Sequence, residues 1–204
     1  MPLSEPGPRE LLHLRDFIIR GYQRADGLYD VEAQLTDAKT YDFPNESRGT
    51  IHAGEALHGM WLRLTVDEDM VIQSCEAATD FGPFAMCGGG AANFHRLAGL
   101  KIGRGFSREV NERVGGVDGC THLREMLQQM ATVAFQTLYP ARMRRQAEAA
   151  ARAAEARGRS GGEPHDATVA AAFGGAPALL NSCHAYRDDG PIVKRRWPEY
   201  YSGT

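Results

Sequence analysis

The chain has 204 residues, of which 43% are hydrophobic, and this is enough for one domain with a sizeable core. Its formal net charge of −3 gives no global electrostatic reason to bind nucleic acid or an anionic membrane surface. Small molecules and proteins remain as partners. The sequence has no apolar run of about 18 residues and no signal-peptide pattern, so we expect a cytoplasmic protein. The four cysteines are widely spaced and include no CxxC pair, which predicts free thiols.

Residues 1–12 are predicted to be a flexible N-terminus, and the first folded element begins at residue 13. The segment "HLRDFIIRGYQRADGLYDVEAQLTDAKTYDF" starts with an apolar and aromatic run and turns at "ADG". In its second half Val31, Ala33 and Leu35 alternate with acidic and amide side chains, as in a strand with one buried face. The segment therefore predicts a β-hairpin.

A second hairpin is predicted after a loop over residues 44–56. In "MWLRLTVDEDMVIQSCEAATD" the apolar residues of the first half share one face, and "DED" turns the chain. These apolar residues are Met60, Leu62, Leu64 and Val66. Two consecutive hairpins followed by helical segments predict an α+β fold, with one antiparallel sheet packed against helices.

The clearest helix is predicted to begin near Cys120 and to end at Pro140. Apolar residues recur there at steps of three and four, namely Leu123, Met126, Leu127, Met130, Val133, Ala134 and Leu138. Proline lacks a backbone N–H and usually ends a helix. We therefore expect one α+β domain over residues 13–140.

The rest of the chain is predicted to contribute less to the core. Residues 141–165 are rich in alanine and arginine and predict an exposed helix followed by a linker. Glu148 and Glu155 interrupt the basic residues and no aromatic residues are interleaved, which favours a solvated helix over nucleic-acid binding. Residues 166–204 are expected to pack back on the domain. The sequence leaves open whether the chain forms a homodimer.

Cys120 is a candidate functional residue because it is predicted to lie at the amino end of a helix. Unpaired N–H groups and the helix dipole stabilise a thiolate there. His122 follows at a Cys-x-His spacing, which can direct a thiolate and an imidazole toward one cavity for metal binding or proton transfer. The alternative is that Cys120 is a small residue packed under the preceding glycine turn.

The second hairpin adds three more titratable candidates. His58 stands at the entry of its first strand, and Glu76 and Asp80 lie on one face of its second strand at a spacing of four. The alternative for the two carboxylates is a solvated sheet face or a loop cap.

The segment "NSCHAY" and Arg63 complete the candidates drawn from the residues alone. In an extended backbone His184 and Tyr186 lie on one side and suit acid and base roles on a hydroxylated substrate, although both are also typical of a hydrogen-bonded core. Arg63 can bind a carboxylate through two hydrogen bonds, or it is an ordinary surface arginine.

In the order and spacing of its motifs, the chain resembles a bacterial family called domain of unknown function 2889. The motifs are "RGYQRADGLYDVEAQLTDAKTYDF", "HGMWLRLTVDEDMVI", "EAATDFGPF", "LAGLKIGRGF", "GCTHLREML", "ATVAFQTL" and "HAY". They cover residues 13 to about 140 and a shorter piece around His184. The alanine-arginine segment belongs to none of them.

About 80 residues from His58 onward are also similar to the iron–sulfur cluster scaffold (NifU/IscU-like) fold, in which a hairpin precedes a long helix that begins with a ligand cysteine. This resemblance places His58 near the first ligand position of that fold, Asp80 or Phe81 near the second, and Cys120 at the third. It implies that His58, Asp80 and Cys120 converge as metal ligands, with His122, Glu76 and Cys87 around them. Two of the three thiols of the scaffold family are replaced in this chain.

For activity, the resemblance to the unknown-function family implies a carbon–carbon lyase that releases formaldehyde from lignin-derived, hydroxymethyl-bearing phenols. This reaction needs a base and an acid but no cofactor. The resemblance to the scaffold fold implies the alternative, a metal-binding or iron–sulfur cluster-carrying protein with a divalent metal or cluster. The predicted catalytic residues are His58, Asp80, His122, Glu76 and Tyr186, and the predicted substrate-binding residues are Trp61, Arg63, Phe81, Phe84, Cys120 and His184.

Overall fold

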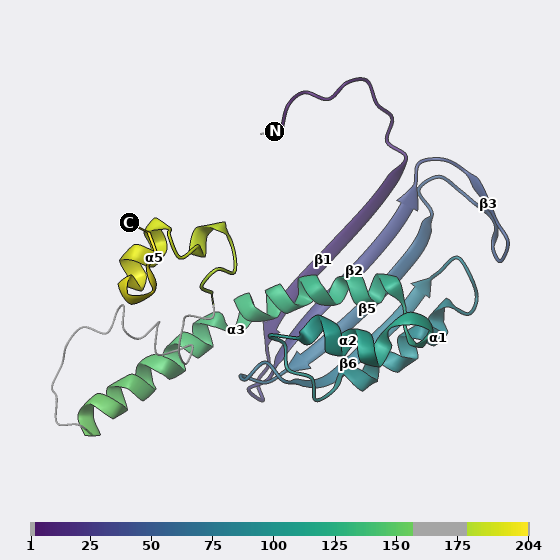
Figure 1. Ribbon diagram of the computed structural model, residues 1–204. Helices are drawn as coiled ribbons and strands as arrows, with labels where there is room; N and C mark the ends of the chain where they lie inside the picture. Colours follow the sequence, from purple (N-terminus) through teal and green to yellow (C-terminus); the bar gives the residue numbers. More distant parts are fainter. Residues whose placement is uncertain (1–2, 157–178, 204) are drawn as a thin grey trace. The chain divides into compact units, whose positions relative to one another are not determined.

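The structure is a computed structural model that describes residues 3–156 and 179–203. The chain divides into two compact units, Met1–Leu138 and Tyr139–Thr204 (Figure 1). The first unit holds the sheet and the helices that cover it, and it is the unit that carries the candidate site. Among the described residues, no helix is long and apolar enough to span a membrane.

The first unit is built on a four-stranded antiparallel sheet of order β1-β2-β5-β6. Its strands are β1 (His13–Gln23), β2 (Tyr29–Lys39), β5 (Ala56–Val66) and β6 (Ile72–Phe81). The two predicted hairpins are confirmed as β1–β2 and β5–β6, and β2 pairs with β5 to join them. The α+β class is therefore confirmed.

Residues 44–56, which are expected to form a loop, contain most of a small third hairpin. It consists of β3 (Phe43–Asn45) and β4 (Gly49–Ile51). Its turn is closed by the Asn45 side chain, which accepts hydrogen bonds from the backbone N–H groups of Ser47 and Arg48. A hairpin this short has no apolar alternation to reveal it in the sequence.

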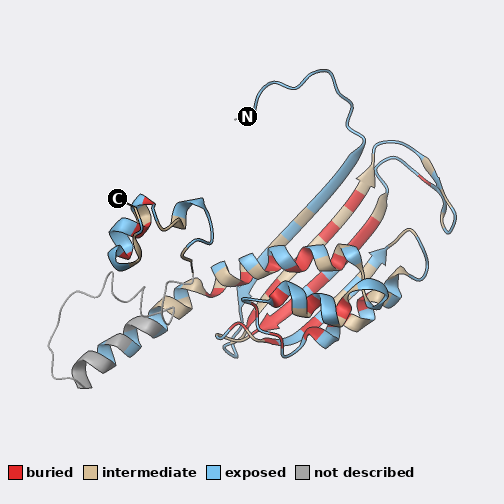
Figure 2. Cartoon of the chain, in the orientation of Figure 1, coloured by how far each residue is buried: buried red, intermediate tan, exposed pale blue. Residues whose placement is uncertain are grey.

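Helices cover one face of the sheet, and this face holds the core (Figures 1 and 2). The helical elements are α1 (Cys87–Ala92), η1 (Asn93–Leu97), α2 (Phe106–Val114), η2 (Gly116–Asp118) and α3 (Thr121–Ala156). Alternate residues of the two central strands, such as Val31, Leu35 and Leu64, are fully buried. Six of the seven apolar residues predicted for α3 are buried as well, Val133 being only half-buried. Each large aliphatic side chain buried in this way contributes about 1.5–3 kcal/mol.

The crossing of α3 over β1 depends on a glycine. A Cβ atom on Gly21 would lie 1.8 Å from Thr137 Oγ1, so any side chain at this position would push α3 off the strand. Glycine thus lets the helix approach the β1 backbone directly.

The predicted end of α3 at Pro140 is wrong, because the helix continues to Ala156 with Pro140 inside it. The alanine- and arginine-rich sequence that follows has a strong helix propensity, which offsets the hydrogen bond lost at the proline. The expected exposed helix and the helix under the sheet are therefore one continuous element.

The described part of the second unit after α3 is short and mostly helical. It comprises η3 (His184–Tyr186), α5 (Pro191–Arg196) and η4 (Pro198–Tyr200), and it is packed around the fully buried Trp197. The expected linker and the first part of the 166–204 segment fall on residues 157–178, which lie outside the described residues.

Candidate active site

The centre of the candidate site is the carboxylate of Asp37, near the end of β2. Asp37 continues the inward-facing alternation of Leu35, and its side chain is only 1% exposed. A buried carboxylate is costly unless charged or hydrogen-bonding groups satisfy it. Arg15 on β1 does so through two 2.7 Å hydrogen bonds, from Nε to Oδ1 and from Nη2 to Oδ2. Arg15 in turn donates from Nη1 to Glu125 on α3, 2.9 Å away.

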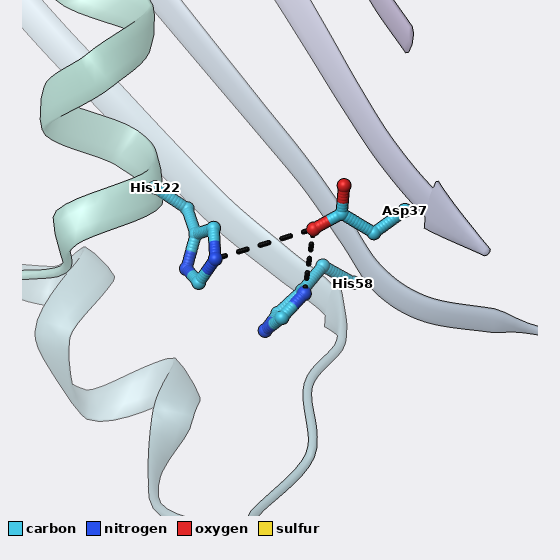
Figure 3. A group of neighbouring side chains, drawn as sticks. All are labelled: Asp37, His58 and His122. Atoms are coloured by element: carbon cyan, nitrogen blue, oxygen red, sulfur yellow. Dashed lines mark hydrogen bonds and ion pairs between the residues drawn. The ribbon is translucent and has the colours of Figure 1, made fainter. Parts of the chain in front are cut away.

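His58 on β5 is the second member of the site (Figure 3). Its Nδ1 lies 2.8 Å from Asp37 Oδ2, and its side chain is 10% exposed. Burial opposes the ionisation of Asp37, but the hydrogen bonds and charges of Arg15 and His58 outweigh this and hold its pKa below the usual value. An ionised carboxylate only accepts hydrogen bonds, so the proton of the contact sits on His58 Nδ1.

The pKa of His58 is also lowered. Burial is the main cause and the neighbouring His122 the second, and together they outweigh the opposing effect of Asp37. His58 is therefore neutral near pH 7, with a proton on Nδ1 and a lone pair on Nε2. Figure 3 shows that this second ring nitrogen points away from Asp37. A neutral histidine held in this tautomer by a carboxylate can act as a general base or as a metal ligand.

His122 completes the group from the first turn of α3. Its ring centroid lies 4.0 Å from that of His58, and its Nε2 lies 4.0 Å from Asp37 Oδ2. Its side chain is 26% exposed, more than the other two. The three residues thus come from three elements, two strands and one helix (Figure 3).

Cys120 precedes α3, as predicted, and its carbonyl accepts the hydrogen bond of Arg124 N. Its Sγ lies 3.9 Å from Met60 Sδ and 3.9 Å from His122 Nδ1. Helix α1 packs close to this turn, since a Cβ on Gly90 would lie 3.1 Å from the Gly119 carbonyl oxygen. Cys120 is therefore half-buried beside the histidine pair, and its contact with His122 brings together the two side chains of the Cys-x-His spacing.

Asp37, His58 and His122 also form a group that could hold a metal ion, because one ligand atom of each lies within 4.8 Å of the others. One carboxylate and two imidazoles suit divalent ions such as Zn²⁺ or Fe²⁺. The predicted ligand set of His58, Asp80 and Cys120 is corrected on this point. Only His58 belongs to the group, and Asp37 and His122 take the other two places.

A cavity of about 790 Å³ lies along α3 next to the site. Its lining residues include Phe17, Thr121 and Glu125. The cavity therefore reaches the carboxylate of Glu125, which accepts a hydrogen bond from Arg15. None of its lining residues is a histidine or cysteine. The cavity therefore lies beside the Asp37–His58–His122 group, and none of these three residues is among its lining residues.

The structure places Asp80, Glu76, Trp61 and Arg63 on the other face of the sheet. Trp61 is 41% exposed between the buried Met60 and Leu62, so it points away from His58. The carboxylate of Asp80 accepts the hydrogen bond of Trp61 Nε1 at 2.8 Å.

Arg63 donates to Glu32 at 2.7 Å and to Glu76 at 3.0 Å. These three residues and Trp61 line a hollow of about 420 Å³ on this outer face. The expected convergence of Asp80 and Glu76 with His58 and Cys120 is therefore wrong, because a strand directs alternate side chains to opposite faces.

The other two predicted aromatic substrate contacts, Phe81 and Phe84, are each 49% exposed. Phe81 packs against Gly59, within 2.7 Å of where a Cβ would stand, and its ring lies under the guanidinium of Arg48. Phe84 lies in the turn before α1.

His184 and Tyr186 belong to the second unit. They lie on η3 rather than on an extended segment, and Tyr186 packs on the ring of Trp197. His184 Nε2 lies 3.1 Å from Arg187 Nη1. The alternation expected to align the two side chains is therefore replaced by a helical turn.

Sequence reasoning missed Asp37 and Arg15. The sequence signal for Asp37 is its position in the alternation of the strand. Val31, Ala33 and Leu35 occupy the buried face, and the next residue on that face is the acid at position 37. An acid on the buried face of a strand must have partners, and Arg15 faces it from the neighbouring strand in direct register.

Comparison with known proteins gives one finding. A family model described as "Protein of unknown function (DUF2889)" matches residues 13–136, which covers the sheet and the first half of α3. No curated protein and no solved structure matches the chain.

Proposed function

We propose that this chain, which belongs to the DUF2889 family, is an aldehyde-releasing carbon–carbon lyase that works by proton transfer at Asp37, His58 and His122. Its substrate class is a phenol that carries a hydroxymethyl side chain. The observation that carries the proposal is the 2.8 Å hydrogen bond between His58 Nδ1 and the buried carboxylate of Asp37. This contact fixes the tautomer of the histidine and leaves Nε2 as the base.

The proposed roles follow from burial and charge. Arg15 keeps Asp37 ionised, Asp37 orients His58, and the lowered pKa of His58 keeps its Nε2 unprotonated at neutral pH. His122 lies in ring contact with His58 and is the most exposed of the three. It supplies the second titratable group, which acts as the acid toward a departing oxygen.

The substrate class rests on the resemblance to the family, and the reaction balances without a redox partner. The phenolate expels a leaving group from the benzylic carbon, with a proton from His122, to give a quinone methide. His58 Nε2 then removes the proton of the primary alcohol. The electrons of the carbon–carbon bond form a new double bond and return the ring to a phenolate, and formaldehyde departs.

The test is formaldehyde release from hydroxymethyl-bearing phenolic dimers by the purified, metal-stripped full chain. We expect release by the wild type, and loss of release on replacing His58 by Gln. A dimer whose phenol is O-methylated should not react, because it cannot form the quinone methide. His52→Gln is the matched control, since His52 also bonds an aspartate but is exposed.

Absence of formaldehyde from the wild type, with or without added metal, would contradict the lyase proposal. Release that is equal in the wild type and in His58→Gln would contradict the assignment of the base.

A second candidate function, a metal-binding protein, is favoured by the clustering of Asp37, His58 and His122 within 4.8 Å. The donor set fits a divalent ion, but Arg15 occupies both oxygens of the carboxylate and its positive charge opposes a cation there. Metal and sulfide analysis after anaerobic purification tests this function and the cluster-carrier alternative together. Stoichiometric metal that is lost in His122→Ala would support it.

A further inference from the structure

One side of β1 is an unpaired sheet edge, whereas the opposite edge of the sheet, at β6, is partly covered by further backbone hydrogen bonds. Strand β1 pairs with β2 in an unbroken register of eleven residue pairs, from His13–Lys39 to Gln23–Tyr29. Within the described ranges 3–156 and 179–203, no backbone hydrogen bond connects its other side to any segment. At the opposite edge, the first residues of β6 bond to the segment 99–102, for example Ile72 N to Leu100 O. Proteins usually protect long edge strands, and β1 has neither a bulge nor a proline.

The outward-facing side chains of β1 form an alternating series. Leu14, Ile18 and Tyr22 are 40%, 44% and 43% exposed. Asp16 and Arg20 stand between them, and neither takes part in an ion pair with any residue that the structure describes. Glu32, which faces Arg20 across the β1–β2 ladder, is instead bonded to Arg63. Within the part of the chain that the structure describes, the two opposite charges that flank the exposed Ile18 thus have no ion-pair partner.

We propose that β1 is a dimerisation edge, on which a second copy of this chain pairs its own β1 antiparallel about a two-fold axis at Ile18. In this register Asp16 faces Arg20 of the second copy and Arg20 faces its Asp16, so both charges gain a partner. Leu14 faces Tyr22, and Ile18 faces itself.

The buried face of β1 fits the same register. Phe17 faces Ile19 of the second copy, which pairs two half-buried apolar side chains. Arg15, whose guanidinium is held by Asp37, faces Gly21, which has no side chain to displace it. A two-fold interface is self-complementary and closes at two copies, so the free edge disappears.

Other registers are worse on charge grounds. An axis at Asp16 places two aspartates opposite each other, and an axis at Arg20 places two arginines opposite each other. An axis at Phe17 or Ile19 sets each charge against an apolar or aromatic side chain. The charges and the apolar residues together therefore select Ile18.

The first test is the dissociation constant of the full chain, measured by sedimentation. We expect a wild-type dimer, and a dissociation constant raised about 10-fold or more by Asp16→Arg or Arg20→Asp, because each change creates two like-charge contacts. The double variant D16R/R20D should restore the dimer, since it exchanges the charges. Both residue changes are on an exposed face, and circular dichroism checks that the fold is kept.

The second test is cross-linking in a Cys183→Ser background, which removes the exposed cysteine. Ile18→Cys should form an intermolecular disulfide, because the two residues at the axis have Cα atoms about 5 Å apart. Tyr22→Cys is the matched control, since its two copies would lie about 26 Å apart.

A protein that is monomeric at all concentrations would overturn the proposal. The free edge of β1 would then be available to pair with a strand of another protein. A dimer would also overturn it if it is insensitive to both charge reversals or cross-links equally at position 22. The inference goes beyond the proposed lyase activity and does not rest on it, and its measurements need no substrate.

Discussion

The first unit contains two Asp–His pairs that have nearly the same contact and opposite titration behaviour. In the sheet, His58 Nδ1 lies 2.8 Å from Asp37, and in the segment after β4, His52 Nδ1 lies 2.9 Å from Asp42. The side chains of the first pair are 10% and 1% exposed, and those of the second are 70% and 57% exposed. The pKa of His58 is lowered, whereas that of His52 is raised by its hydrogen bond to Asp42.

The difference shows that surroundings, rather than the contact itself, decide what such a pair can do. Burial and the adjacent His122 keep His58 neutral, so it retains a lone pair that can accept a proton. Water solvates the charged form of His52, and the carboxylate of Asp42 then favours protonation. The buried pair therefore keeps its histidine neutral at neutral pH, whereas the exposed pair favours protonation, and most of the predictions below test this contrast.

The largest expected effect is on catalysis. His58→Gln keeps a similar shape but removes the base, so formaldehyde release should fall at least 100-fold. His52→Gln should leave the rate unchanged, because its pair lies in the exposed loop and not in the site. The initial rate of formaldehyde release at saturating substrate measures both. Equal losses in the two variants would show that the distinction between the pairs is wrong.

The next effect is on stability. Asp37→Asn removes the buried negative charge that bonds Arg15 and His58, and it leaves the Arg15 guanidinium without its main partner. We therefore expect the free energy of unfolding to fall by about 3 kcal/mol. Asp42→Asn should cost much less, because water solvates both partners of that exposed pair. Urea denaturation followed by circular dichroism gives both values. A small loss for Asp37→Asn would mean that Glu125 alone can satisfy Arg15.

The sequence predicted the sheet and the core of α3 because both depend on periodic burial of apolar residues. The site was harder, since it depends on pairings between distant strands. His58 and His122 are among the residues predicted from the sequence, whereas only a resemblance groups Asp80 with them. Trp61 alternates with the buried Met60 and Leu62, so it lies on the opposite face of the sheet, and Asp80 bonds to it there. The partner of His58 was in the first hairpin, and only the β2–β5 pairing brings Asp37 opposite it.

The pH dependence of stability should have opposite signs for the two histidines. The folded-state pKa of His58 is below its unfolded value, so its contribution is present above about pH 6.5 and is lost as pH falls through the folded value. The folded-state pKa of His52 is raised, so its contribution is present below about pH 6.5 and is lost as pH rises through the folded value.

Urea denaturation at pH 7.5 and pH 5.5 tests these signs. The stability difference between the wild type and His58→Gln should shrink at the lower pH, and that between the wild type and His52→Gln should grow. The lowered pKa of Asp37 affects a lower range, below about pH 4, and does not disturb this comparison. Differences that move in the same direction for both variants would contradict the opposite shifts.

The smallest effect is expected from the outer-face charges, which extend the comparison to a pair without histidine. Arg63 bonds Glu32 and Glu76, and the Glu76 side chain is 74% exposed. Solvent screens such a contact, and ordering two long side chains costs entropy, so Glu76→Gln should change the free energy of unfolding by less than about 0.5 kcal/mol. The remaining effect should shrink further in 0.5 M salt, whereas the loss in Asp37→Asn should not, because the buried carboxylate is shielded from ions. A salt-independent loss in Glu76→Gln would show that the outer face, too, holds a structurally specific ion pair.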